Sequence, residues 1–169
     1  SEAGVMKIQP DQDYRLAHQQ TLSEAFTIIG KGVHSGVQFI LRVLPAPSGE
    51  GICFVRRDIT LVDNEIIVDP YSIKLVDDTT TVANAYGVRV VNVAAIIQAL
   101  LDCCIDNATI VIDGPEVPMP NGCGFEGNCA RFRQLIAEAG IRRQVGPKHS
   151  IGLPGDAFNV FDTQQRDSP

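Results

Sequence analysis

Residues 90–104 read VVNVAAIIQALLDCC, and this stretch decides the fold. Asn92 is a favourable N-cap and no Gly or Pro interrupts the residues after it, so the sequence predicts a helix that follows Asn92. Gln98 and Asp102 are its only strongly polar side chains. The apolar arc therefore spans roughly 260° of the helix, which is wider than the single stripe of a surface helix. We expect such a helix to be buried on two sides.

The segments around this helix are rich in β-forming residues. Two such runs flank the turn KGVHSG, and GICFVRR, NEIIVDP and IKLVDDTTTVANA continue the pattern. NATIVIDG follows the helix as another strand, and a second, amphipathic helix is expected to begin near Asn128 and to stop at Gly140. This order predicts an α+β fold: a mixed β-sheet with two helices packed on one face.

The length of the chain, 169 residues, suits one domain with a substantial core. We expect a single domain over residues 20–143, because the β-rich pattern begins after a polar segment and the second helix ends shortly before 143. Residues 1–19 are predicted to form a flexible N-terminal arm. Residues 144–169 mix Gly and Pro with a few apolar residues, which indicates a C-terminal tail or strap.

Charge and composition exclude several kinds of partner. The net charge is −6 and the pI is near 4.9, which disfavours a nucleic-acid binder or binding to an anionic membrane. No segment is long and apolar enough to predict a membrane span, and no secretory signal is visible. The odd number of cysteines, five, with an adjacent pair, is not typical of a disulfide framework. We therefore expect a cytoplasmic protein.

Cys123 and Cys129 enclose the segment CGFEGNC. A structural zinc site requires four ligands, and no histidine lies in this segment. The spacing also differs from the Cys-x-x-Cys pattern of redox motifs. Ordinary thiols are the favoured interpretation, with a metal site and a redox pair as the less favoured alternatives.

Several motifs occur together in a distinctive order: GVHSG at 32–36, PAPSGEGICFVRR at 45–57, IDNA at 105–108 and GPEVP at 114–118. Over about residues 20–141 the chain resembles the N-terminal domain of the UDP-3-O-acyl-N-acetylglucosamine deacetylases, the LpxC family of bacteria. The resemblance implies a fold like domain 2 of ribosomal protein S5. It also implies a zinc hydrolase of lipid A biosynthesis, with two similar domains whose helical layers face each other across the active site.

The resemblance breaks down at the start of the long helix. The family has Thr-Val-Glu-His there, in which the His binds zinc and the Glu is the general base, whereas this chain has Asn92, Val93, Ala94 and Ala95. Alanine has no lone pair for a metal and no group that accepts a proton. The chain also lacks the His-x-x-x-Asp pair that the family's second domain contributes. We therefore expect no catalytic residues, no zinc or other cofactor, and a protein that is not an enzyme.

The function expected on these grounds is an inactive binding or regulatory module. The alternatives are a zinc-dependent UDP-3-O-acyl-N-acetylglucosamine deacetylase and a carrier of an acyl chain or acylated sugar. The residues of a possible residual site are His34, Thr79, Thr80 and Glu116. A simpler interpretation of His34 is that it forms hydrogen bonds within its own turn.

The wide apolar arc of the long helix also predicts a partner. A homodimer is the first expectation, because a second copy would stand where the family's second domain lies, and a different protein partner is the second. Small residues allow another helix to approach closely. The predicted interface consists of Ala95, Ile96, Ala99, Leu100 and Cys103. The alternative is that the arm or the tail covers this face.

Overall fold

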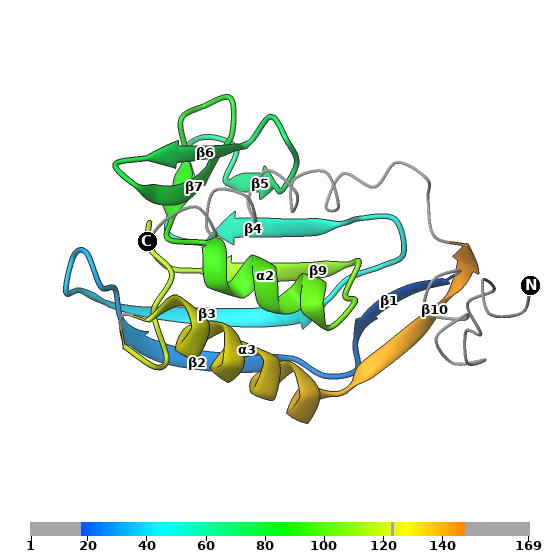
Figure 1. Ribbon diagram of the computed structural model, residues 1–169. Helices are drawn as coiled ribbons and strands as arrows, with labels where there is room; N and C mark the ends of the chain where they lie inside the picture. The colour runs from blue at the N-terminus through cyan, green and yellow to red at the C-terminus, as the bar shows by residue number, and fades with distance from the viewer. Residues whose placement is uncertain (1–17, 123, 148–169) are drawn as a thin grey trace, which may run out of the picture.

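The structure of the protein is a computed structural model that describes residues 18–122 and 124–147. Its centre is a five-stranded sheet in the order β2-β3-β9-β4-β5 (Figure 1). The strands are β2 (Phe26–Lys31), β3 (Gln38–Pro45), β9 (Ala108–Ile112), β4 (Ile52–Arg56) and β5 (Glu65–Ile67). Strands β4 and β9 run parallel and the other neighbours run antiparallel, so the sheet is mixed.

Two helices, α2 (Ala94–Asp102) and α3 (Phe125–Ala139), lie side by side on one face of this sheet (Figure 1). Alternate strand residues point toward the helices and are buried, because side chains along a strand alternate between its two faces. These residues include Leu41, Val43, Phe54, Ile110 and Ile112. The predicted α+β architecture with two helices on one face is therefore confirmed.

Two smaller sheets complete the described structure. Strand β1 (His18–Leu22) pairs antiparallel with β10 (Ile141–Pro147), so the first and last described segments lie side by side. Strands β6 (Ile73–Val76), β7 (Thr79–Ala83) and β8 (Arg89–Val91) form a three-stranded antiparallel sheet at the other end. Regular structure continues four residues past the expected boundary at 143, while residues 1–17 and 148–169 lie outside the described residues.

Both helices begin at positions different from those expected. The N-cap of α2 is Val93, and Asn92 instead has a left-handed backbone with φ of 62°. Asn tolerates this conformation better than most residues, so it turns the chain from β8 toward the helix. Helix α3 begins at Phe125, three residues before Asn128. Neither described helix is long and apolar enough to cross a membrane.

The predicted partner interface is buried within this chain. Ala95, Ile96, Ala99 and Leu100 are at most 3% exposed, and Cys103 is half-buried. The apolar arc of α2 is wide because the helix packs against α3 as well as against the sheet. Burial on two sides therefore occurs inside one domain, and the prediction that these residues form a free docking face is wrong. A homodimer as such stays a prediction.

A buried polar cluster holds the chain together just beyond the C-terminal end of α2. We call Asn107 with its hydrogen-bond partners the Asn107 cluster. The Asn107 side chain accepts a hydrogen bond from the Gly51 N–H at 2.8 Å and donates to the side-chain oxygens of Gln19 and Gln144, each at 2.8 Å. Asn107 is 1% exposed. The cluster therefore joins β1, β10 and the loop before β4 through bonds that water cannot replace.

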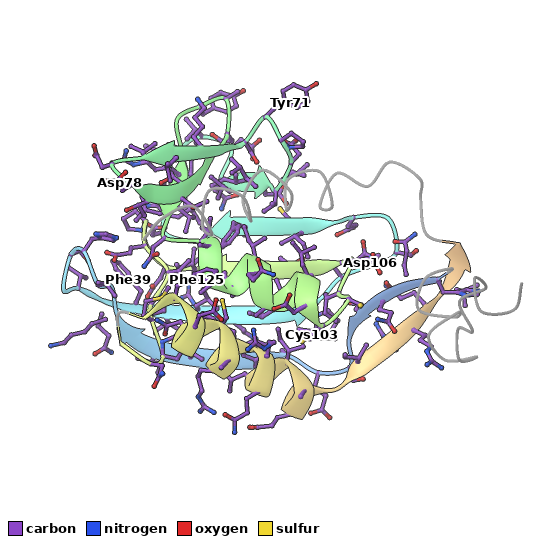
Figure 2. All side chains as sticks on the ribbon, viewed as in Figure 1. Phe39, Tyr71, Asp78, Cys103, Asp106 and Phe125 are labelled. Atoms are coloured by element: carbon purple, nitrogen blue, oxygen red, sulfur yellow. The ribbon has the colours of Figure 1, made fainter. Side chains whose placement is uncertain are left out.

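Gln20 and Asp106 extend the same arrangement toward the helix. The Gln20 side chain donates to the Cys104 carbonyl at 2.9 Å, and the Gln20 N–H donates to the Asp106 carboxylate at 2.8 Å. The IDNA motif thus anchors strand β1 beside the end of α2. Figure 2 shows Cys103 and Asp106 at this end of the helix.

Candidate functional site

The segments that carry the predicted site residues meet at the start of α2. The Val93 N–H donates to the Thr80 carbonyl at 3.1 Å, which ties the first turn of the helix to β7. The Val91 N–H donates to the Pro115 carbonyl at 2.7 Å, so the segment that contains Glu116 lies beside β8. The turn between β2 and β3 carries His34 to the same place. The structure therefore brings His34, Thr79, Thr80 and Glu116 into one region.

Glu116 fastens the turn that presents His34. Its carboxylate accepts hydrogen bonds from the backbone N–H of His34 at 2.7 Å and of Ser35 at 3.0 Å. The side chain is buried, with 2% exposure. A Cβ atom at Gly32 would overlap this carboxylate, so only glycine fits beneath it. Glu116 therefore positions the turn through backbone donors on both of its oxygens.

The His34 ring contacts a residue from another element. Its Nε2 lies 3.4 Å from the Thr79 hydroxyl oxygen, and the direction of the bond depends on the tautomer of the ring. Asp77 and Asp78 form a two-residue hairpin turn with φ of 50° and 60°, and this turn places Thr79 next to His34. Figure 2 shows Asp78 at the tip of the β6–β7 hairpin. His34 is exposed, so its ring is open to a ligand.

Thr80, Ala94 and Ala95 complete the region, but they present no polar side chain at the surface because Thr80 is buried and alanine is apolar. Thr80 is 2% exposed, and its carbonyl is the group that bonds α2. Ala94 and Ala95 are 5% and 3% exposed and present only methyl groups. The exposed polar side chains of the two turns here are those of His34, Ser35, Asp77 and Asp78, and Thr79 is half-buried.

The zinc that the resemblance implies does not fit the described residues by themselves. Among residues 18–122 and 124–147 no group of three or more His, Cys, Asp or Glu side chains is arranged to hold a metal ion. A catalytic zinc needs about three protein ligands. Any such site requires ligands from outside this part of the chain.

The described cysteines have the character of ordinary buried thiols. Burial, reinforced by the nearby carboxylate of Glu126, raises the pKa of the Cys129 thiol to about 12. Burial and Glu65 likewise raise the pKa of Cys53 to about 11. Reactive cysteines require the opposite shift, because the thiolate is the nucleophile. Cys123, the other member of the CGFEGNC segment, lies outside the described residues.

A separate pocket of about 580 Å³ lies at the opposite end of α2. It is lined by Gln20, Ser23, Cys103, Ala137, Ile141, Arg142 and Arg143. Of these, only Cys103 belongs to a set predicted from the sequence. The pocket forms because β10 pairs with β1, and the sequence gives no local signal for that pairing.

The fold and the site define a class of protein: an α+β domain whose central helix begins beside a histidine-bearing turn. Residues 19–162 match the family model described as LpxC, UDP-3-O-acyl N-acetylglycosamine deacetylase. The match covers most of the chain, and this chain belongs to the LpxC family.

Relatives carry the same description in several bacteria. The chain is 39% identical over 153 residues to the UDP-3-O-acyl-N-acetylglucosamine deacetylase of Myxococcus xanthus (strain DK1622), covering 89% of this chain and 46% of the relative. It is 35% identical to the protein of that name from Phenylobacterium zucineum (strain HLK1), covering 80% and 44%. For Shewanella sp. (strain ANA-3) the identity is 33%, covering 80% and 42%. The chain thus spans less than half the length of these relatives.

These relatives correct one expectation. From Ala94 and Ala95 we expected a protein that is not an enzyme. That prediction is wrong as an assignment of class, because the chain belongs to an enzyme family and its relatives at 33–39% identity are named as deacetylases. The presence of Ala94 and Ala95 at the start of one helix does not by itself establish that the protein is inactive.

Proposed function

We propose that this chain works in the deacetylation of UDP-3-O-acyl-N-acetylglucosamine, as the half of the enzyme that helps to bind this substrate. The observation that carries the proposal is the contact between His34 and Thr79 beside the first turn of α2. Glu116 holds this arrangement from beneath through two backbone hydrogen bonds. The proposal also draws on the names of the relatives.

The side chains of His34 and Thr79 suit binding of a polar substrate, and the exposed carboxylates of Asp77 and Asp78 lie in the neighbouring turn. An imidazole and a hydroxyl at the surface are hydrogen-bonding partners for sugar hydroxyls and phosphate oxygens. The first turn of a helix carries backbone N–H groups without helical partners and a partial positive charge, which favours anions. Because the described residues do not form a zinc site, the groups that hydrolyse the amide come from beyond them.

Binding to the full chain tests this role. We expect UDP-3-O-acyl-N-acetylglucosamine to bind in a calorimetric titration, and His34→Ala and Thr79→Ala each to weaken binding by about tenfold, the value of one or two lost hydrogen bonds. Thr27→Ala is the matched control. Thr27 is an exposed threonine near the start of β2, and the turn that carries His34 follows the other end of this strand. Binding that both site substitutions leave unchanged would contradict the proposal.

Catalysis is tested by complementation. The full chain is mixed with the segment of the Myxococcus xanthus relative that it does not match, and acetate release is measured. We expect more acetate than from that segment alone. Replacing Ala94→Glu and Ala95→His in the chain alone is expected to give no turnover, because the other ligands are still missing. Acetate release by that variant would show that this chain holds a complete site.

The acyl chain of the substrate is not expected to bind along α2. Ile96 and Leu100 are fully buried, so they present no free surface to an acyl chain. This burial argues against carriage of an acyl chain on these residues. Ala94 and Ala95 at the start of the helix are buried too, so the exposed His34 ring is the group that this region offers to a substrate. We also propose a cytoplasmic location, because an odd number of cysteines with an adjacent pair does not suit a disulfide framework.

A further inference from the structure

The central sheet has a second face, turned away from α2 and α3, that is apolar at its centre. Within residues 18–122 and 124–147, both helices lie on the other face (Figure 1). Ile67 on this second face is 57% exposed, and Val55 and Val111 are half-buried, whereas the residues that point toward the helices are buried. A partly exposed apolar sheet face of this kind is a candidate interaction surface.

Strand register arranges this face in rows that run across the sheet. One row contains Leu44, Thr109, Cys53 and Ile67, on β3, β9, β4 and β5 in that order. The next row contains Arg42, Val111, Val55 and Glu65 on the same four strands. Asp113 and Arg57 follow directly after β9 and β4 and continue the alternation to a third row. The rows therefore differ in where their charged and apolar side chains lie across the sheet.

These rows are complementary to themselves under one particular rotation. A two-fold axis parallel to the strands and between β9 and β4 exchanges β9 with β4 and β3 with β5. In the second row, Arg42 then faces Glu65 of the second copy and Val111 faces Val55 of the second copy. In the first row, Leu44 faces Ile67 of the second copy. In the third row, Asp113 stands opposite Arg57 of the second copy, although one oxygen of its carboxylate already accepts the Ile40 N–H at 2.9 Å.

An axis displaced by half a strand spacing loses this match. An axis through β9 itself would place Arg42 opposite Val55 of the second copy and Glu65 opposite Thr27 of the second copy, so neither charge would meet an opposite charge. Like or unpaired charges in an interface are costly, and opposite charges fix its register. Charge complementarity therefore favours the axis between β9 and β4 over the axis through β9.

We propose that two copies of this chain form a two-fold dimer through the second face of the central sheet. The two sheets pack about 10 Å apart with their strands nearly aligned, as in β-sandwiches. This surface lies opposite the helical layer, and the inference stands independently of the proposed substrate. The contact is isologous, so each charge pair occurs twice.

The face is small for a dimer interface. Four strands about 5 Å apart, crossed by three rows about 7 Å apart, cover about 400 Å² per copy, or about 800 Å² in total, which is below the size of stable specific interfaces and fits a weak, transient dimer. We expect a dissociation constant of about 10 µM.

Sedimentation and light scattering of the full chain, from about 1 µM to about 500 µM, measure this constant. The expected result is a rise from monomer to dimer mass centred near 10 µM. A monomer over the whole range overturns the proposal. In that case variants that lack 1–17 or 148–169 identify whether one of these segments covers the face. A dimer that the variants below leave unchanged overturns it as well.

Charge exchange tests the register directly. Arg42→Glu and Glu65→Arg are each expected to weaken the dimer by about tenfold, because each replaces two attractive contacts with two repulsive ones. The double variant restores the opposite charges in exchanged positions and is expected to return to within about threefold of the original. Arg131→Glu, an exposed arginine on α3, is the matched control and should leave dimerisation unchanged. Failure of the double variant to recover, with both single variants folded by circular dichroism, overturns the proposed register.

Discussion

The two ends of α2 differ in what their side chains do. Beyond the C-terminal end, the Asn107 side chain makes three short hydrogen bonds at 2.8 Å in a buried position. At the N-terminal end, Ala94 and Ala95 present only methyl groups, and the exposed His34 ring approaches the Thr79 hydroxyl at 3.4 Å. The buried side-chain hydrogen bonds at the first end support the fold, whereas the second end also presents an exposed imidazole.

This difference separates two kinds of motif within one family resemblance. The IDNA and GPEVP segments supply Asn107 and Glu116, whose buried polar groups must be paired for the chain to fold. The residues that begin α2 carry chemistry in the family, whereas in this chain Ala94 and Ala95 are part of the buried core. Motifs of the first kind report the fold, and only motifs of the second kind report the reaction.

Removal of the Asn107 side chain is expected to have the largest effect. Asn107→Ala removes the side-chain acceptor of the Gly51 N–H and one hydrogen bond each from the side chains of Gln19 and Gln144, which should lower the free energy of unfolding by about 4 kcal/mol. Urea denaturation measures this loss. Gln98→Ala, which removes one exposed hydrogen bond to Asp102, is the control and should cost under about 0.5 kcal/mol. Equal losses would break the contrast between the ends of the helix.

The glycine beneath the His34 turn should be the next most sensitive position. Gly32→Ala places a methyl group against the buried carboxylate of Glu116, and we expect a loss of about 2 kcal/mol in the free energy of unfolding. Gly124→Ala is the control, because no atom lies within 4 Å of the added methyl group and φ is −80° there. A stable Gly32→Ala variant would mean that the turn is free to move away from Glu116.

Replacement of Glu116 by Gln tests the negative charge of this side chain while keeping its size. Glu116→Gln keeps one carbonyl acceptor but sets an NH2 group against either the His34 or the Ser35 N–H, so a loss of about 1.5 kcal/mol is expected. Hydrogen exchange of these two amides should accelerate more than exchange in the Asn107 cluster. Uniform acceleration throughout the domain would indicate that Glu116 supports the whole fold and not only the turn.

The smallest effect is expected at Thr79. Thr79→Val removes the long contact to His34 and should change the free energy of unfolding by under about 0.5 kcal/mol, because one weak bond near the surface is lost. The same variant should weaken substrate binding, which separates function from stability at this end of α2. A loss above about 2 kcal/mol would place Thr79 among the residues on which the fold depends.

The architecture could be predicted from the sequence because strong patterns specify it. The apolar run after Asn92 and the stripe of the second helix mark α2 and α3, and NATIVIDG marks the strand between them. The role of Asn92 could not be predicted, since Asn is common both at N-caps and in left-handed turns. Asn128 was misplaced for a similar reason: its side chain bonds backward to Asn121, Gly122 and Gly124, although it lies inside the helix.

Of the candidate site, the structure shows only that its residues lie together, and their role stays a prediction. His34, Thr79 and Glu116 come from distant segments, and the family resemblance is what indicates all three. The sequence could not show that the Glu116 carboxylate accepts hydrogen bonds from backbone N–H groups, because those bonds depend on how the turn folds over it. The partner face was misassigned because a helix covered by both a sheet and a second helix has the same apolar arc as one that awaits another subunit.

The pairing of β1 with β10 has a consequence for biosynthesis. The strands are joined in register at Gln20 and Arg143, which are more than a hundred residues apart along the chain. Local contacts form early and such distant ones form late. On the ribosome the bonds of Gln20 to Cys104 and Asp106 can therefore form before β10 is made, whereas the pairing of β1 with β10 and the bond between Asn107 and Gln144 form only after Gln144 has left the exit tunnel.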